Sequence, residues 1–586
     1  MDPTNRNTAL ASAFVEELAR CGVRHAVLAP GSRSTPLAVA LWRQPAIDAT
    51  VLVDERCAGF FALGAAQATR RPVAVLCTSG TAAANLHPAV AEADEAAVPL
   101  LLLTADRPPE LRGIGAGQTI DQLKLYGDAV RWFCEVGTHD ADDDGLLHLR
   151  ATACRAYAAA RGEPRPGPVH LNLAWREPLA PVPVEGDVTA TSPLALEGRG
   201  EAPLTAVPPS AAEPEPALLD ELAARLAAAP RGLILAGRQS DPSLAAPITK
   251  LAAAAGYPIL AEPTSQLRLG SHDRDLVVTA YDAIARVSPP SLAPDLVVRF
   301  GDMPTSKALR LWLASLERCR QVVVDPAYGW NEPSRNAETI VRVDAASLAA
   351  GVATRLRDGD RERAWADAWL AADGAAAETI AAELSSLEKP TEPGLHAALG
   401  GAYRDGELVY TASSMPVRDQ EAFLPSTEAN VLFLCNRGAN GIDGLISSGV
   451  GAAHASGRPT VIVSGDLGLL HDLGGLAALS GTDAVVRIIV IENEGGRIFD
   501  FLPQAAAMDR AEFEELMITP RRLDLERVAA LFDLSHHRVS DLPRIRSGLD
   551  RGTALIGVAV DPRSNVELHD SLNRAAADGL RISLDA

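Results

Sequence analysis

Short runs of valine, isoleucine and leucine alternate with alanine-rich stretches along nearly the whole chain. In the first third these runs occupy residues 23–29, 50–53, 73–77 and 100–104, and each is followed by a loop of small or charged residues. Such alternation predicts parallel β-sheets covered by helices on both faces. Because ligands of open α/β sheets bind at the carboxyl ends of the strands, these loops are predicted to form one wall of a site.

Breaks in the alternation divide the chain, whose 586 residues exceed the roughly 100–200 of a typical domain. A stretch rich in Pro, Ala and Glu and, later, a polar helical segment separate three α/β blocks. The predicted fold class is α/β, with three doubly wound parallel-sheet domains. The expected boundaries are a first domain over 1–180, a Pro-rich linker over 181–215, a central domain over 216–357, a linker helix over 358–393 and a third domain over 394–586.

The charge and the apolar runs exclude several classes of partner. The formal net charge of −21 argues against binding to nucleic acid or anionic lipid, because the electrostatic attraction would have the wrong sign. No apolar run reaches the roughly 18 residues that a membrane span needs, and the amino-terminal residues lack a signal pattern. We therefore expect a cytoplasmic protein. The seven cysteines form no CxxC pair, which favours reduced thiols over a disulfide or zinc framework.

An aspartate and an asparagine follow two neighbouring apolar runs in the last third of the chain. Asp466 opens the segment DLGLLHDLGG after the run 460–464, and Asn493 ends the next run. Their separation fits one helical crossover, so both are expected at the same edge of a parallel sheet. One carboxylate, one amide oxygen and a backbone carbonyl near Gly495 suit Mg²⁺ that carries a diphosphate, since Mg²⁺ takes only some of its about six oxygens from protein.

Two plainer interpretations fit the same segment. Asp466 could cap a helix in an ordinary Rossmann-like unit. His471 and Asp472 could also form a metal pair, although adjacent side chains on a helix diverge by about 100°. The Asp and Asn pattern taken alone does not decide among these interpretations.

Longer motifs carry a specific resemblance. The Asp466 and Asn493 pattern resembles the thiamine diphosphate fingerprint, with GDL in place of GDG and EN in place of NN. Four motifs resemble the pyrimidine-binding domain of the 2-succinyl-5-enolpyruvyl-6-hydroxy-3-cyclohexene-1-carboxylate synthases of menaquinone biosynthesis: APGSRSTPLA, VDERCAGFFALG, TSGTAAANLHPAVAEA and LTADRPPELRGIGAGQTIDQ. The resemblance continues through FGDMPTSKAL, SSMPVRD, CNRGANGIDG, SGDLGLLHDLGGL and ENEGGRIFDFLPQ.

The resemblance implies a transferase that uses thiamine diphosphate with Mg²⁺ or Mn²⁺. Such an enzyme decarboxylates 2-oxoglutarate and adds the succinyl carbanion equivalent to isochorismate, which gives 2-succinyl-5-enolpyruvyl-6-hydroxy-3-cyclohexene-1-carboxylate. It also implies the thiamine diphosphate-binding fold, with a pyrimidine-binding, a central Rossmann-like and a diphosphate-binding domain.

The resemblance also assigns roles to residues. Glu55 is expected to hydrogen-bond the pyrimidine N1′ and so to assist loss of the C2 proton, although the helix dipole would also favour a glutamate at this helix start. The other residues expected at the reacting centre are Ser32, Arg33 and Gln118. The expected substrate-binding residues are Arg107, Lys307, Ser414, Arg418, Arg437, Ile498, Phe499 and Leu502. The expected cofactor contacts beside Glu55 are Ile442, Gly465, Asp466, Leu467 and Asn493, and the expected metal ligands are Asp466, Asn493 and Gly495.

Arginines in the predicted loops distinguish the implied reaction from that of a related enzyme. Both implied substrates are dicarboxylates, and arginine binds carboxylates in a bidentate manner. A related carboligase of the acetolactate synthase type would share the fold and Glu55 but take pyruvate, a monocarboxylate for which four loop arginines are excessive. A non-catalytic regulatory protein on the same fold is a further alternative. The four loop arginines that argue against pyruvate as the substrate are Arg33, Arg107, Arg418 and Arg437.

Glu55 and Asp466 lie in different predicted domains, yet one cofactor must contact both. In the family that the chain resembles, these two domains come from different subunits. We therefore expect a homodimer or homotetramer with active sites between subunits.

Overall fold

The structure is a computed structural model that describes residues 1–162, 164–356 and 363–585. The chain forms two compact units. The first comprises Met1–Ser210, Asn436–Gly457 and His471–Ala484, and the second comprises Ala211–Cys435, Arg458–Leu470 and Val485–Ala586. The described residues form three six-stranded sheets in which neighbouring strands run parallel, so the predicted α/β fold class is confirmed.

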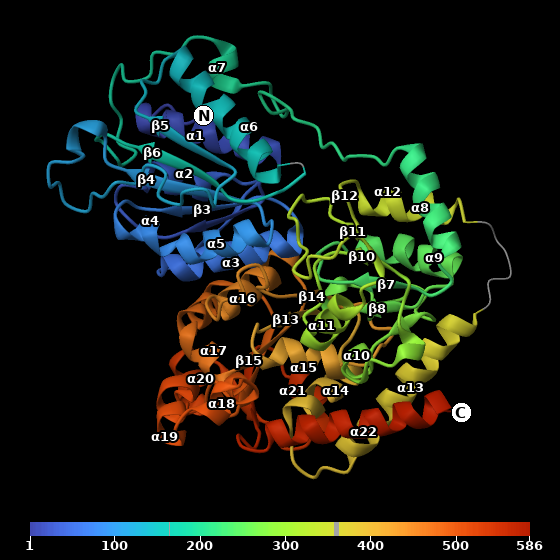
Figure 1. The fold of residues 1–586 in the computed structure, drawn as a ribbon. Helices are drawn as coiled ribbons and strands as arrows, with labels where there is room; N and C mark the ends of the chain where they lie inside the picture. Colours follow the sequence, from blue (N-terminus) through green and yellow to red (C-terminus); the bar gives the residue numbers. More distant parts are fainter. Residues whose placement is uncertain (163, 357–362, 586) are drawn as a thin grey trace. The chain divides into compact units, whose positions relative to one another are not determined.

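The first sheet belongs to the first unit and has the strand order β2-β1-β3-β4-β6-β5. Its strands are β1 (His25–Leu28), β2 (Asp48–Val51), β3 (Val73–Cys77), β4 (Leu100–Asp106), β5 (Trp132–Gly137) and β6 (Val169–Ala174). The helices of this unit are α1 (Arg6–Cys21), α2 (Thr35–Arg43), α3 (Glu55–Thr69), α4 (Thr81–Asn85), α5 (His87–Glu95), α6 (Asp143–Arg161), α7 (Pro193–Glu197) and α16 (Leu445–Ser456). Figure 1 shows α1 and α6 on one side of the sheet and α3 and α5 on the other.

Small residues bring two helices of the first unit into close contact. An ideal Cβ at Gly64 of α3 would lie 1.8 Å from the carbonyl oxygen of Ser448 in α16. A Cβ at Gly451 of α16 would lie 2.0 Å from the carbonyl oxygen of Phe61. The two helix backbones can approach this closely only because glycine has no side chain.

The second sheet has the order β12-β11-β10-β7-β8-β9, which is the doubly wound order of the Rossmann fold. Its strands are β7 (Gly232–Ala236), β8 (Ile259–Ala261), β9 (Val277–Val278), β10 (Leu296–Phe300), β11 (Arg320–Val324) and β12 (Thr339–Val341). One apolar core packs it against α8 (Pro216–Ala228), α9 (Ala245–Ala255) and α12 (Ala345–Ala353). A second core packs its other face against α10 (Tyr281–Val287), α11 (Lys307–Ser315), α13 (Ala364–Ser385) and α22 (Asn565–Asp585).

The third sheet repeats the order of the first, β14-β13-β15-β16-β18-β17. Its strands are β13 (Leu408–Thr411), β14 (Leu432–Leu434), β15 (Thr460–Gly465), β16 (Val486–Glu492), β17 (Ser535–Arg538) and β18 (Ala554–Ala559). The connecting helices of the second unit include α14 (Glu392–Ala402), α15 (Met415–Phe423), α17 (Asp466–His471), α18 (Gln504–Ala507), α19 (Arg510–Phe513), α20 (Leu525–Leu531), α21 (Ile545–Leu549) and the 3₁₀ turn η6 (Arg497–Phe501). The switch point of this sheet, where ligands bind in such folds, lies between β13 and β15.

The segment expected to be a linker helix contains α13, whose Trp369 is fully buried in the core of the second sheet. Helix α13 packs along the carboxyl-terminal helix α22, and Figure 1 shows the two side by side. The expected boundary between residues 357 and 358 lies outside the described residues. Within the described part of the chain, no helix is both long and apolar enough to cross a membrane.

Candidate active site

Asp466 lies at the carboxyl end of β15, beside the switch point of the third sheet. Only 4% of its surface is exposed. Its Oδ1 accepts a hydrogen bond from the backbone N–H of Leu467 at 2.7 Å, and its Oδ2 accepts one from Gly495 at 3.1 Å. The carboxylate therefore joins the ends of β15 and β16, which are neighbouring parallel strands.

Asn493 follows β16 directly and is also buried. Its side-chain Nδ2 donates to Oε1 of Glu392 at 2.9 Å, whereas its Oδ1 is buried without a hydrogen-bond partner. Because an unpaired buried oxygen is costly, such an atom calls for a ligand. While Glu392 is ionised, the bond to it fixes which atom of the carboxamide stays available, since a carboxylate accepts from the nitrogen and not from the oxygen.

Gly495 shapes the turn that follows Asn493. Its φ of +129° is one that side chains rarely adopt, and a Cβ there would lie 2.5 Å from the carbonyl oxygen of Ile518. Its N–H points to Asp466, and its carbonyl accepts from the N–H of Arg497 at 2.9 Å. Glycine is therefore needed here for both conformation and space.

The carboxylates at this edge are held in a poorly solvated environment. Burial raises the pKa of Asp466 to about 6, against the opposing effect of backbone N–H groups and Arg497. Burial and the charge of Asp419 raise the pKa of Glu392 to about 7, although the bond from Asn493 lowers it. A bound cation would offset this cost of burying negative charge.

These residues fit a divalent metal with a preference for oxygen. A buried carboxylate and an unpaired amide oxygen are ligands that Mg²⁺ and Mn²⁺ accept, and neither is a sulfur or nitrogen donor.

Glu392 was missed by the sequence reasoning because it lies in the segment 358–393, which was expected to be a linker helix. The sequence feature that could have pointed to Glu392 is the motif TEP, in which Thr391 caps α14.

Other expected residues of the second unit occupy three places. Arg418 of α15 donates from Nη1 to the carbonyl oxygens of Ser413 at 3.1 Å and Ser414 at 2.6 Å, which brings it together with Ser414 at the end of β13. Three apolar residues in or just after η6 remain partly exposed: Ile498, Phe499 and Leu502. Lys307 is the exposed first residue of α11. In the described chain we find no hydrogen bond or ion pair that joins Lys307 to these residues.

The first unit brings two further expected residues, Arg107 and Gln118, into contact with Ser79, which follows β3. Arg107 donates from Nη1 to Oγ of Ser79. Gln118 donates from Nε2 to the carbonyl oxygen of Ser79 at 3.1 Å, and Oγ of Ser79 donates to the carbonyl oxygen of Gln118 at 3.1 Å. Burial and the charge of Arg107 lower the pKa of Arg33, whose Nη1 donates to the carbonyl oxygen of Trp175 at 2.8 Å. Ser32 is exposed in the same loop as Arg33.

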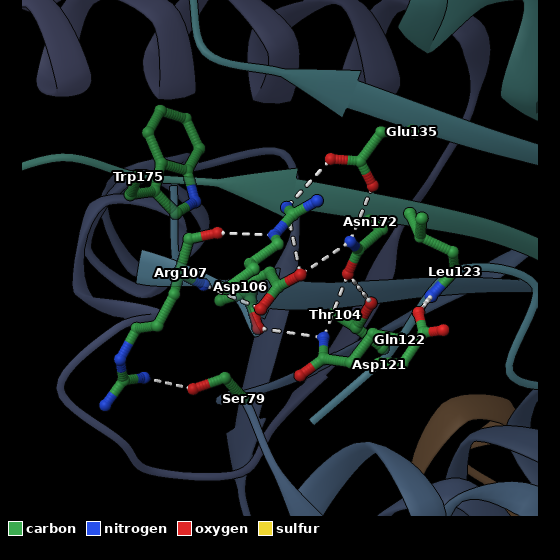
Figure 2. Close-up of polar contacts among 12 residues, drawn as sticks. Ser79, Thr104, Asp106, Arg107, Asp121, Gln122, Leu123, Glu135, Asn172 and Trp175 are labelled. Atoms are coloured by element: carbon green, nitrogen blue, oxygen red, sulfur yellow. Dashed lines mark hydrogen bonds and ion pairs between the residues drawn. The ribbon is translucent and has the colours of Figure 1, made fainter. Parts of the chain in front are cut away.

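A buried polar network supports this loop, and Figure 2 shows it. Gln122 accepts from the N–H of Gly80 at 2.9 Å and donates to Oδ1 of Asn172 at 2.9 Å. Asn172 donates to Oδ2 of Asp106 at 2.9 Å, and Oδ1 of Asp106 accepts from the N–H of Arg107 at 2.7 Å. The network thus connects the loop of Gln118 to the ends of β4 and β6. The sequence reasoning missed it because a buried strand with polar residues does not give an apolar run.

Glu55 is the first residue of α3 and is partly buried. Its Oε2 accepts from Nδ2 of Asn85 at 3.3 Å. Asp54 caps the helix, since its side chain accepts from the N–H groups of Arg56 and Cys57. Glu55 is therefore not needed as a cap, and its carboxylate keeps acceptor capacity for another group.

Arg437 and Ile442 lie on the loop 436–444 of the first unit. Glu92 holds this loop, because its two carboxylate oxygens accept from the N–H groups of Gly438 and Ala439, each at 2.7 Å. Ile442 is 47% exposed, which is unusual for a large apolar side chain in an ordered loop. Phe60 of α3 packs where a Cβ of Gly444 would stand, so the loop lies beside the helix that Glu55 begins.

Comparisons with known proteins agree with these features. The family model described as "Thiamine pyrophosphate enzyme, N-terminal TPP binding domain" matches residues 8–125. The chain is 41% identical to a 2-succinyl-5-enolpyruvyl-6-hydroxy-3-cyclohexene-1-carboxylate synthase of Myxococcus xanthus, over 97% of this chain and 97% of that protein. Proteins of the same name from Chloroflexus aurantiacus and Geobacillus kaustophilus are 43% and 40% identical, over 96% and 95% of this chain and 95% and 96% of theirs.

The family model lies within the first unit and includes Glu55. The matches to the synthases cover at least 95% of the chain and so extend over both units, with the segments that carry Asp466 and Asn493. The resemblance inferred from the sequence motifs is confirmed, and thiamine diphosphate is supported as the cofactor. The chain belongs to the family of 2-succinyl-5-enolpyruvyl-6-hydroxy-3-cyclohexene-1-carboxylate synthases.

Proposed function

We propose that this chain is a transferase that forms 2-succinyl-5-enolpyruvyl-6-hydroxy-3-cyclohexene-1-carboxylate, the product in the name of its relatives. The reaction removes CO₂ from 2-oxoglutarate and joins the remaining succinyl unit to isochorismate by conjugate addition. Thiamine diphosphate, when bound, supplies the nucleophilic carbon at which a 2-oxo acid can lose CO₂. One observation supports the proposal independently of the relatives' names. Asp466 and Asn493 are both buried, and Oδ1 of Asn493 lacks a hydrogen-bond partner.

The residues around this pair would hold the diphosphate end of the cofactor through Mg²⁺ or Mn²⁺. Asp466 and Asn493 offer one oxygen each, and the turn at Gly495 offers a backbone carbonyl. Gly465 and Leu467 flank the carboxylate and would lie against the cofactor. Two hard oxygen ligands at one strand edge support this assignment.

Glu55 would serve the pyrimidine end of the cofactor. Its carboxylate is partly buried, and Asp54 already caps the helix. Glu55 would share a proton with N1′ of the pyrimidine and so favour the tautomer that accepts a proton at the neighbouring amino nitrogen. Ile442, exposed on the loop that packs beside Phe60, would support the bent cofactor.

The substrate carboxylates require cations, because the chain as a whole is strongly acidic. Arg33 and Arg107 lie close enough for one charge to lower the pKa of the other, and a bound dianion would relieve that repulsion. Gln118 and Ser32 would contact the reacting atoms beside them. Arg418 with Ser414, and also Arg437 and Lys307, would bind further carboxylate oxygens. The apolar residues Ile498, Phe499 and Leu502 would exclude water from the isochorismate ring.

We propose further that active chains assemble as homodimers or homotetramers. Glu55 belongs to the first unit and Asp466 to the second, and one cofactor has to contact both. In the proposed assembly, Glu55 of one copy and Asp466 of another serve the same cofactor. The expected division of the chain remains a proposal as well: 1–180, 216–357 and 394–586 as domains.

The test is a reaction with a choice of donor. Purified chain with thiamine diphosphate, Mg²⁺ and isochorismate is given either 2-oxoglutarate or pyruvate, and CO₂ and product mass are measured. We expect CO₂ and the succinyl adduct in equal amounts from 2-oxoglutarate, and far less turnover of pyruvate. Preference for pyruvate would support an acetolactate-forming enzyme instead. Cofactor binding without CO₂ from either donor would support a non-catalytic protein.

A further inference from the structure

Three side chains of metal-binding type meet at the edge of the first sheet opposite to the loops of Arg33 and Glu55. His25 and Asp48 are the first residues of β1 and β2 and are partners in the parallel register. His454, in the last turn of α16, points to the same place within the first unit. Nε2 of His454 lies 3.0 Å from Oδ2 of Asp48, and Nδ1 of His25 lies 3.9 Å from that oxygen.

The spacing of these atoms fits one metal ion. One ligand atom from each of the three residues lies within 4.8 Å of the other two. In a tetrahedral zinc site with bonds of roughly 2.0–2.1 Å, ligand atoms lie about 3.4 Å apart. Side-chain shifts of less than about 1 Å therefore convert this cluster into three vertices of a tetrahedron. In the described residues we find no second group of three His, Cys or acidic side chains with this spacing.

Ordinary hydrogen bonding explains the cluster only in part. A simple ion pair between His454 and Asp48 would account for the 3.0 Å contact. It leaves Nδ1 of His25 buried without a hydrogen-bond partner, although the atom lies 3.9 Å from the same carboxylate. Native proteins seldom leave a buried ring nitrogen unpaired, so this atom is an independent indication of a missing ligand.

The surroundings of His25 suit a neutral imidazole ligand. Burial lowers the pKa of His25, and although Asp48 opposes that shift, His454 and Arg71 add to it. Metals bind the neutral form of histidine. The ring of Phe61 packs 5.6 Å from that of His454 and covers one side of the cluster. Oγ1 of Thr50 lies 3.3 Å from Nε2 of His454 and could hold a water molecule in the fourth position.

We propose that His25, Asp48 and His454 form a binding site for a transition-metal dication, with Zn²⁺ as the preferred ion. Two imidazoles and one carboxylate are a ligand set of zinc and its neighbours, whereas Mg²⁺ prefers oxygen ligands alone. The site is thus chemically different from the one proposed at Asp466 and Asn493. It would fasten α16 to β1 and β2, and α16 directly follows the loop that carries Arg437 and Ile442. We expect a structural role, in which bound Zn²⁺ stabilises the first unit.

The test measures metal binding and not turnover. The full chain is stripped with a chelator, dialysed without thiamine diphosphate, and titrated with Co²⁺ while the visible absorption of tetrahedral Co²⁺ is recorded. Zn²⁺ is then added to displace Co²⁺, and the melting temperature is measured with and without Zn²⁺. The variants are His454→Gln and Asp48→Asn. The controls are His148→Gln, which alters a histidine whose ring lies 4.5 Å from that of His139, and Asp466→Asn, which removes a ligand of the other proposed metal site.

We expect one equivalent of Co²⁺ with a tetrahedral spectrum, displacement by Zn²⁺, and a higher melting temperature with Zn²⁺. His454→Gln and Asp48→Asn should weaken binding by more than about 10-fold, since even the loss of an outer partner of a metal ligand has that effect. Both controls should bind as the unaltered chain does. Asp48 is mostly solvent-exposed, so Asp48→Asn keeps the test valid if His454→Gln does not fold. The absence of a tetrahedral spectrum, or equal binding by the variants and His148→Gln, would overturn the proposal.

Discussion

Nδ2 of Asn493 donates a hydrogen bond of 2.9 Å to Oε1 of Glu392, and both side chains are buried. This hydrogen bond determines which end of the Asn493 carboxamide is engaged and which end stays available. Because the ionised carboxylate can only accept, the amide nitrogen faces Glu392 and the unpaired Oδ1 is left for a ligand. Glu392 therefore acts on the proposed metal site through Asn493, as a positioning residue.

Replacement of Glu392 should weaken metal binding without removing a metal ligand. In Glu392→Gln, the new side chain can donate as well as accept, so the Asn493 carboxamide is free to turn its nitrogen toward the metal. We expect Mg²⁺-dependent binding of thiamine diphosphate to weaken by about 10–100-fold, as for other partners of metal ligands. Calorimetric titration measures this. Glu388→Gln, at an exposed position in the preceding segment, makes the same charge change and should have no effect. Equal affinities for the two variants would contradict the positioning role.

Glu55→Gln should separate cofactor binding from cofactor activation. The amide can occupy the same space and still hydrogen-bond, so thiamine diphosphate should remain bound. It cannot share a proton as the carboxylate does, and general acid–base groups contribute about 10²–10⁴-fold. We expect hydrogen–deuterium exchange at C2 of the bound cofactor, followed by NMR, to slow by that order. The exposed Glu317→Gln serves as the control. Unchanged exchange in Glu55→Gln would remove this residue from its proposed role.

The contact between α3 and α16 should not tolerate a methyl group. A Cβ at Gly64 would stand 1.8 Å from the carbonyl oxygen of Ser448, and overpacking of a rigid core costs about 1–3 kcal/mol. We expect Gly64→Ala to lower the urea midpoint of unfolding. Gly374→Ala is the matched control, because no atom lies within 4 Å of a Cβ at that position of α13. There the better helix propensity of alanine should stabilise by about 0.5–1 kcal/mol. A stable Gly64→Ala variant would show that the two helices separate readily.

Buried His170 should make the chain less stable at mildly acidic pH. Burial lowers the pKa of His170 to about 3, from an ordinary value of 6.5. Between these values the unfolded chain binds a proton that the folded chain does not, so stability falls as pH drops below about 6.5. From pH 7 to pH 5 the loss from this group alone is about 2 kcal/mol. His170→Gln cannot titrate and should show a shallower fall of the urea midpoint. Parallel pH profiles for both proteins would contradict the assignment.

The sequence predicted well the strands that are apolar throughout. The run 73–77 is β3, and the run 100–104 lies within β4, because central parallel strands are buried on both faces. The sequence gives no such signal for two of the edge strands: β9 has two residues, and β17 reads SHHR. Strand β6 was missed for another reason, since the buried polar side chains of His170 and Asn172, which bond to Thr104 and Asp106, interrupt its apolar pattern.

The candidate site was predictable where one residue at a strand end carries the chemistry. Asp466 and Asn493 are such residues, because parallel strands present their carboxyl ends at the same edge of the sheet. Glu392 and Gln122 were not predictable in this way. Their roles depend on hydrogen bonds to residues about 100 and 50 positions away, and no local pattern encodes such partners. The shared strand order of the first and third sheets is likewise a property of topology that the sequence does not repeat.

The central claim is that Glu55 of one copy and Asp466 of another serve the same cofactor. The most direct test combines two inactive variants, Glu55→Gln and Asp466→Asn, in one assembly. Co-expression with different affinity tags and sequential purification isolates the mixed dimer, whose CO₂ release from 2-oxoglutarate with isochorismate is then measured. One of its two sites would contain both unaltered residues, so we predict recovery of about half of the unaltered activity. Mixed dimers as inactive as either parent would contradict the claim.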